Sequence, residues 1–189
     1  MDRLIRADLY RHARRSGLKG FSEAWFISGF RYTFFFRKVQ QHKKYSIPGI
    51  FYRLLLRRYS YKYGFQINPR AQIGEGFFLS EHQGPVIIGA PVKIGKNCNI
   101  AHTVTLGQTL RGPTKGHPTI DDNVWIGTGA VITGKIKIGK NVLIAPNAFV
   151  SFNVPDNSLV VGNPARIFRN DNATLGYINN VLEEKETLS

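Results

Sequence analysis

The sequence predicts a mainly β protein, a left-handed parallel β-helix of hexapeptide repeats that is preceded by a short α-helical segment. Branched aliphatic residues recur at every sixth position, and a second series of small or β-branched residues follows four positions after them. Most aromatic and basic residues lie in the first third of the chain. A helix repeats its apolar positions every three to four residues and a strand every two. A six-residue period fits neither and is typical of a repeat solenoid.

Two series of residues keep this register along most of the chain. The first consists of Ile67, Ile73, Leu79, Ile88, Ile94, Ile100, Leu106, Ile120, Ile126, Ile132, Ile138, Ile144 and Val150. The second consists of Ala71, Val92, Cys98, Val104, Val124, Ala130, Ile136, Val142 and Ala148. We expect each six-residue unit to form one flat face of a triangular coil.

The register is interrupted at two places. Three extra residues precede Ile88 and eight extra residues precede Ile120. We expect these insertions to form loops extruded from the coil, because a solenoid fixes the ends of such loops while their side chains stay free to face a ligand. Each insertion contains a histidine, His82 in the first and His117 in the second. These two loops are therefore the predicted functional region.

The chain divides into three segments. Residues 1–64 form a basic, aromatic-rich helical segment, residues 65–168 form the coil, and residues 169–189 form a tail that is helical or flexible. Of the net charge of +14, the first segment supplies most, with 15 Lys and Arg against 3 Asp and Glu, and it holds 15 of the 23 aromatic residues. Helices are expected over roughly 2–15, 22–42 and 48–60, with breaks at 17–20 and 48–49.

The basic segment allows two interpretations. Arginines and lysines interleaved with aromatic rings suit the surface of an anionic membrane. Alternatively, the rings pack on one another and on the first coil while the charges are solvated.

No base-reading motif accompanies the charge, so a nucleic-acid partner is not expected. No apolar run approaches the length of a membrane span, no signal peptide is recognisable, and Cys98 is the single cysteine, so we expect a cytoplasmic protein, at most peripheral on the inner membrane.

Five motifs carry a resemblance to a known family. They are HQGPVII at 82–88, VTLG at 104–107, GHPTI at 116–120, NVWIGTGA at 123–130 and GNPAR at 162–166. Over 73–166 the chain resembles the acyltransferase domain of the serine acetyltransferase family, and most closely its short relatives, the polysaccharide and lipopolysaccharide O-acetyltransferases. The resemblance implies acetyl transfer from acetyl-CoA to a hydroxyl group by a homotrimer.

The expected chemistry centres on the two loop histidines. A hydroxyl that attacks a thioester must lose its proton, and a neutral imidazole is suited to accept it near neutral pH. His82 is the expected general base, and by resemblance His117 positions the acceptor or stabilises the oxyanion. Where the family often has an aspartate this chain has Gln66, so Glu81 orients His82, binds the acceptor or does neither. The alternative for each loop histidine is a hydrogen bond to backbone.

Several other residues are candidates for the same site. The role of His102 stays open, because it lies inside a repeat unit. Cys98 belongs to the second series, so direct transfer is expected rather than an acyl-cysteine. The histidines lack metal-ligand spacing, and no metal is expected. By resemblance the donor-binding residues are Gly107, Thr128, Lys140, Ala145 and Arg166, although a glycine can also mark a tight corner.

The expected acceptor follows from two positions at which this chain departs from the pattern of serine acetyltransferases. Serine acetyltransferases have an arginine just before the second histidine, where this chain has Gly116, which offers no fork to a carboxylate. The terminal isoleucine with which that family docks cysteine synthase is also absent, so this partner is not expected. The sequence thus favours a sugar hydroxyl of a surface-polysaccharide or lipopolysaccharide precursor. Serine O-acetyl transfer in cysteine biosynthesis is the alternative, and a non-catalytic scaffold is a further one.

Overall fold

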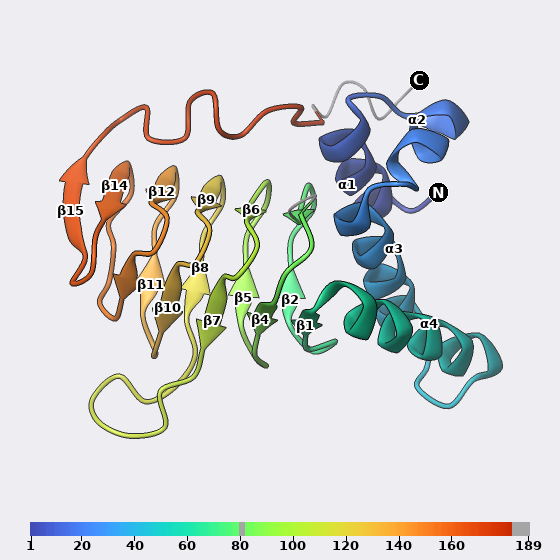
Figure 1. Cartoon of the computed structure of the whole chain (residues 1–189), viewed down its shortest axis with the longest axis horizontal. Helices are drawn as coiled ribbons and strands as arrows, with labels where there is room; N and C mark the ends of the chain where they lie inside the picture. Colours follow the sequence, from blue (N-terminus) through green and yellow to red (C-terminus); the bar gives the residue numbers. More distant parts are fainter. Residues whose placement is uncertain (80–81, 183–189) are drawn as a thin grey trace.

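The computed structural model describes residues 1–79 and 82–182, in which four helices lie at one end of a parallel β-helix (Figure 1). The helices are α1 (Arg3–Ala13), α2 (Gly17–Ala24), α3 (Ser28–Gln41) and α4 (Ile47–Tyr63). Among these residues, no helix combines the length and the apolar character that crossing a membrane requires.

The coil consists of three sheets, which are the three faces of the predicted triangle. The first contains β1 (Phe65–Ile67), β4 (Val86–Ile88), β7 (Thr105–Gly107), β10 (Val131–Thr133) and β13 (Phe149–Val150). The second contains β2 (Gln72–Ile73), β5 (Lys93–Ile94), β8 (Thr119–Ile120) and β11 (Lys137–Ile138). The third contains β3 (Phe78–Leu79), β6 (Asn99–Ile100), β9 (Val124–Ile126), β12 (Val142–Ile144), β14 (Ser158–Val161) and an antiparallel last strand, β15 (Arg166–Arg169). The predicted β-helix fold is confirmed.

Both residue series of the sequence point into the coil. Every member is buried, and in-phase members stack on one another, as Ile67 does on Ile88 and Ile88 on Leu106. Burying a Val, Leu or Ile side chain contributes about 1.5–3 kcal/mol. The six-residue period therefore records a continuous apolar core that runs along the whole coil.

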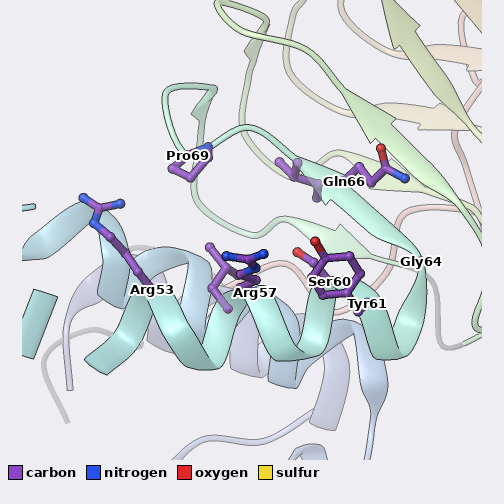
Figure 2. Close-up of a pocket in the computed structure, with 9 residues that line it drawn as sticks. Arg53, Arg57, Ser60, Tyr61, Gly64, Gln66 and Pro69 are labelled. Carbon is purple, nitrogen blue, oxygen red and sulfur yellow. The ribbon is translucent and has the colours of Figure 1, made fainter. Parts of the chain in front are cut away.

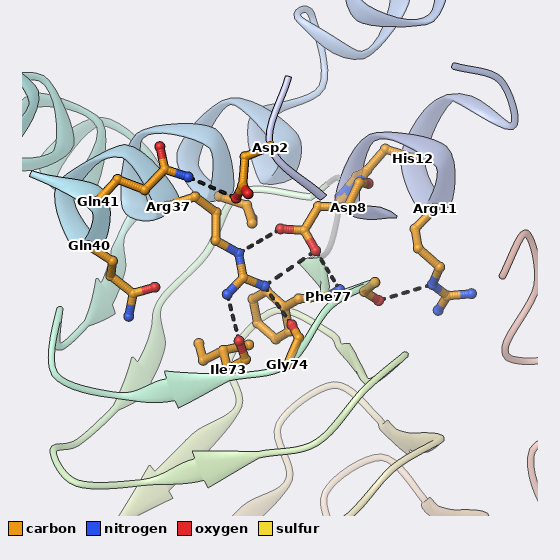
Figure 3. Close-up of polar contacts among 12 residues, drawn as sticks. Asp2, Asp8, Arg11, His12, Arg37, Gln40, Gln41, Ile73, Gly74 and Phe77 are labelled. Atoms are coloured by element: carbon orange, nitrogen blue, oxygen red, sulfur yellow. Dashed lines mark hydrogen bonds and ion pairs between the residues drawn. The ribbon is translucent and has the colours of Figure 1, made fainter. Parts of the chain in front are cut away.

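The N-terminal helices close the open edge of the first coil through a buried ion pair (Figure 3). Arg37 of α3 donates from Nε to Oδ2 of Asp8 of α1 at 2.8 Å, and both side chains are 1% exposed. The same guanidinium donates to the carbonyls of Ile73 and Gly74 at 2.6 Å, while Oδ1 of Asp8 accepts from the Phe77 amide at 2.8 Å. Backbone groups that the first coil would leave unpaired at its edge are satisfied in this way.

Aromatic packing holds most of the helical segment together. Phe30, Tyr32 and Phe36 are buried, and Phe21 and Trp25 stack at 5.3 Å between ring centroids. For α2 and α3, the interpretation that the rings pack on each other and on the first coil is therefore confirmed, since the Tyr32 ring also meets that of Phe65 in β1. The outer face of α4 differs, because it leaves large apolar side chains exposed.

One expectation about the helical segment is wrong. Helix α2 occupies 17–24, where a break was predicted. The reason is that Gly20 lies in a close contact, since a Cβ there would overlap the carbonyl of Arg15. The described part of the tail, 170–182, contains no helix. It runs back along the coil towards α1 (Figure 1), where the Tyr177 ring lies 5.0 Å from that of Trp125 and the Asn179 carbonyl accepts from Arg11.

Candidate active site

One histidine pair lies at the corner between the third and first sheets. His82, in the segment between β3 and β4, is exposed, and its ring meets that of His102 edge to face at 5.6 Å between centroids. The backbone leading into β4 passes close to His102, because a Cβ on Gly84 would lie 3.3 Å from the His102 Cβ. His102, whose role the sequence leaves open, therefore lies beside His82, the predicted general base.

Thr103, at the same corner, has an unusual backbone conformation. Its φ of 59° is in the left-handed region, which is unusual for a β-branched residue. The equivalent corners in the next two coils are occupied by Gly129 and Asn147, residues that adopt this conformation at little cost. The backbone strain is thus stored directly beside His102.

His117 lies at a different corner, between the first and second sheets. Its ring packs over Gly89, where a Cβ would lie 3.3 Å from Nδ1 and from Cε1. Its Nδ1 is buried and has no hydrogen-bond partner in the described part of the chain. The loop that carries it is held by reciprocal backbone hydrogen bonds between Thr109 and Gly116, at 3.0 and 2.9 Å. The histidine is therefore fixed in place while one nitrogen lacks a partner.

The two loop histidines do not meet within one chain. The first lies near Gly84, before β4, and the second packs over Gly89, just after β4. The five steps of extended backbone from Gly84 to Gly89 span about 16 Å. Hydrogen-bond catalysis needs contacts of about 3 Å. One chain thus presents two separate halves of a histidine site, one at each end of the first sheet.

The predicted donor residues are distributed over three corners. Thr128 and Ala145 lie on the His102 corner, one and two coils further on, and Arg166 begins β15, opposite Val161 at the end of that column. Gly107 ends β7 on the His117 side, and its Cβ would meet only ordinary contacts of 3.6 Å and beyond, so the coil itself does not require glycine there.

Lys140 lies apart from the other donor candidates. It occupies the corner between the second and third sheets, where charges alternate from coil to coil. Lys96 Nζ lies 3.0 Å from Glu75, and Lys140 Nζ lies 4.0 Å from Asp122. The Lys140 amide also donates to Asp156 at 2.8 Å. Lys140 therefore contributes to the polar contacts between successive coils.

Of two further positions considered with His82, Gln66 and Glu81, the structure describes only Gln66. Gln66, at the position of the family's aspartate, lies on β1 and lines a cavity beneath α4. Glu81 lies outside the described residues.

Cys98 is fully buried, and burial raises the pKa of its thiol to about 12, which suits a core residue and not a nucleophile. Within 1–79 and 82–182, no three His, Cys, Asp or Glu side chains gather as a metal site would require.

A cation that the sequence motifs do not indicate lies beside Gly116. A Cβ on this glycine would come within 3.0, 3.4 and 3.6 Å of Cβ, Cγ and Cδ of Lys135. The φ of Gly116, +136°, is also strained for any other residue. Lys135 is exposed, and no described carboxylate pairs with it. Its position next to the loop follows from the fold, and the only signal in the sequence is its place one residue before Ile136 in the second series.

Comparison with known proteins identifies the class. The sequence profile of the bacterial transferase hexapeptide family (six repeats) matches residues 117–151. A protein named serine acetyltransferase from Staphylococcus xylosus is 39% identical over 139 residues, which are 74% of this chain and 62% of that protein. The chain therefore spans less than two thirds of this relative's length. The repeats and the profile define a hexapeptide-repeat transferase.

Solved structures narrow the class to a family. Two structures of serine acetyltransferase from Brucella abortus, one in complex with coenzyme A, are 31% identical with TM-scores of 0.72 and 0.73, over 88% of this chain and 68% and 67% of theirs. The Neisseria gonorrhoeae enzyme in complex with serine is 32% identical, with a TM-score of 0.69, over 86% of this chain and 67% of that one. The chain belongs to the serine acetyltransferase family.

These findings contradict the sugar acceptor that the sequence favoured. The relatives named above are serine acetyltransferases, at 31% to 39% identity. The expectation rested on Gly116, which has no side chain to hold a carboxylate. This expectation considered position 116 alone. In the fold, Lys135 from the segment between β10 and β11 packs against Gly116. The comparisons give no support to a role in polysaccharide biosynthesis.

Proposed function

We propose that this protein transfers the acetyl group of acetyl-CoA to the hydroxyl of L-serine. The observation that carries the proposal is the likeness, over 86% of the chain, to a serine acetyltransferase in complex with serine. The histidines and the cation described above fit this reaction. Serine offers one hydroxyl to be deprotonated and one carboxylate to be held.

In the proposed reaction His82 is the general base. Its imidazole takes the proton of the serine hydroxyl as the oxygen attacks the thioester carbonyl, and it returns a proton to the leaving thiolate. The ester bond forms and the thioester bond breaks, so that free coenzyme A leaves. His102 lies against His82 and positions its ring. His117 supplies a donor to the acceptor or to the tetrahedral oxyanion.

The column of Thr128, Ala145 and Arg166 fits the donor. Neighbouring strands are about 4.8 Å apart, so the column extends roughly 19 Å from the His102 coil to the last strand. Small side chains along it leave room for a narrow, extended pantetheine arm, and Arg166 at its end is exposed for a phosphate. When bound, acetyl-CoA supplies the activated acetyl group. Gly107 would line the opposite side of the groove, whereas Lys140 lies at another corner.

The separation of the two histidine corners supports a site shared between copies of the chain. A second copy can place its His117 corner against the His82 corner of the first, which brings both imidazoles to one hydroxyl. Closing this contact with three copies gives a homotrimer with three equal sites. The His117 corner, with its ring packed over Gly89, would then lie at the contact between subunits.

Lys135 is the proposed partner of the serine carboxylate. It lies against Gly116, the residue that precedes His117, and its side chain is exposed without a paired carboxylate in the described chain. An ammonium group binds a carboxylate as a point charge, without the two parallel hydrogen bonds of a guanidinium. The carboxylate is thus held beside the histidine that positions the acceptor.

Release of free thiol from acetyl-CoA tests the proposal. The acceptors to compare are L-serine, serinol, which replaces the carboxylate by a hydroxymethyl group, and a neutral sugar such as D-glucose. We expect saturable turnover with L-serine, weak turnover with serinol and background rates with the sugar. Faster turnover of serinol or of the sugar than of L-serine would contradict the proposed acceptor.

A further inference from the structure

The outer face of α4 leaves a row of apolar side chains exposed. At 100° per residue, positions 47, 50, 51, 54, 58 and 61 lie within about 60° of one direction. Five of them carry apolar or aromatic residues, which we call the α4 stripe: Ile47, Ile50, Phe51, Leu54 and Tyr61. Ile47, Leu54 and Tyr61 are 87%, 62% and 76% exposed. The opposite face, with Leu56 and Tyr63, is buried.

Cations and no anions surround this stripe. Between residues 24 and 74 the chain has ten Lys and Arg and neither Asp nor Glu. Arg58 lies on the stripe's own face of α4, and Arg57 and Lys62 lie at its edges. No carboxylate of the described residues pairs with these three side chains. The face thus combines exposed apolar area with uncompensated positive charge.

A cavity of about 640 Å³ opens between the edge of the stripe and β1. Figure 2 shows that Arg53, Arg57, Ser60 and Tyr61 of α4 line it. The Nε of Arg53 is buried and finds no hydrogen-bond partner among the described residues. A guanidinium whose buried nitrogen lacks an acceptor, beside a second guanidinium and a hydroxyl, suits an anionic oxygen-rich group such as a phosphate.

We propose that α4 docks on the surface of an anionic lipid bilayer, with the α4 stripe at the headgroup boundary and a lipid phosphate between Arg53 and Arg57. A helix with one apolar and one cationic face lies in the membrane plane in this way. Charge complementarity decides against a second copy of this chain, because two α4 faces brought together would oppose cations to cations. This interaction is independent of the acetyl acceptor.

Vesicle co-sedimentation of the full chain tests the proposal. The vesicles are phosphatidylcholine alone, or phosphatidylcholine with about a third phosphatidylglycerol. We expect binding to the anionic vesicles at about 0.1 M salt, and a loss of at least ten-fold at about 1 M salt, where the Debye length falls to about 3 Å. Equal binding to both vesicle types, or binding to neither, would overturn the proposal.

Paired variants separate the two components of the surface. Arg57→Gln with Arg58→Gln should weaken binding about 25-fold, because each cation near the surface contributes about five-fold. Lys93→Gln with Arg169→Gln removes the same charge from exposed positions on the coil and should leave binding within two- to three-fold of the unmodified chain. Equal losses from both pairs would show that only net charge matters and would overturn the proposed surface.

The apolar component has its own variants and an oligomer control. Phe51→Gln with Leu54→Gln should weaken binding to anionic vesicles at least ten-fold, whereas Phe168→Gln with Leu175→Gln, also at exposed positions, should not. All four residues are exposed, so thermal unfolding should be unchanged. The mass in lipid-free solution should also be unchanged. A smaller assembly for the α4 variant alone would show that the stripe binds another copy, and would overturn the membrane assignment.

Discussion

His82 and His117 have separate duties in the proposed reaction. The first accepts the proton of the serine hydroxyl, and the second positions the acceptor or stabilises the oxyanion. We expect His82→Asn to lower kcat by about 10² to 10⁴, the usual effect of losing a general base, with a smaller loss for His117→Asn. His42→Asn, in the helical segment, is the control and should retain full activity. Steady-state kinetics with L-serine provide the test, and near-normal turnover of His82→Asn would refute the assignment.

Lys135 should affect the binding of serine and not the chemistry. Lys135→Met removes the charge beside Gly116, so KM for L-serine should rise about ten-fold or more while kcat changes little, and serinol should be used as before. A surface ion pair is worth up to about 1 kcal/mol, and a charge-assisted contact to a bound substrate more. Lys137→Met is the matched control, since Lys137 is paired with Asp121 at 2.9 Å. Equal effects of both variants on KM would exclude the specific role.

The sequence singled out residues of the candidate site where a motif contained them, and it missed contacts that only the three-dimensional fold creates. His82 and His117 stood out because they interrupt a strict register. The contact of His102 with His82 and that of Lys135 with Gly116 join residues 20 and 19 positions apart. Such contacts depend on how far each loop folds over the coil, which a six-residue period does not encode.

At the scale of elements, the buried pair of Asp8 and Arg37 joins the helices to the coil. Burial raises the pKa of Asp8, and the Arg37 guanidinium opposes that rise. We expect Arg37→Met to lower the free energy of unfolding by about 3–5 kcal/mol, because it leaves a buried carboxyl without its partner. Arg3→Met, which breaks an exposed pair with Glu75, should cost less than about 1 kcal/mol.

The loss caused by Arg37→Met should also depend on pH. Without the guanidinium the folded-state pKa of Asp8 rises further above its unfolded value. A raised carboxyl pKa gives stability at low pH that is lost as the pH increases. The variant should therefore be less destabilised at pH 5 than at pH 8 in urea unfolding. A loss that is independent of pH would show that Asp8 does not titrate in this range.

The elements of the coil were predictable because one physical rule repeats. Each buried aliphatic residue stacks on its equivalent in the next coil, so the period is visible in the sequence. The helical segment obeys no such repeat. Glycines at 17 and 20 suggested a break, but Gly20 is required for the close approach of α2 to Arg15. The tail packs on the coil through Tyr177 and Trp125, whose pairing has no local signature.

At the scale of the whole molecule, each chain holds two half-sites about 16 Å apart along β4. Catalysis in this account needs His82 of one copy and His117 of another. Sedimentation should therefore show an oligomer, and an active monomer would contradict the shared site. The oligomer also makes a sharper experiment available, because variants of the two histidines can be combined in one assembly.

Mixing the two variants tests the central claim most directly. His82→Asn and His117→Asn chains are unfolded together in equal amounts, refolded, and assayed for thiol release with L-serine. If each site takes one histidine from each of two neighbours in a three-fold ring, about a quarter of the sites in random assemblies are intact. The account predicts that activity rises well above that of either variant alone, towards a quarter of the unmodified protein. Activity no higher than the average of the two variants would place both histidines in one chain and contradict the shared site.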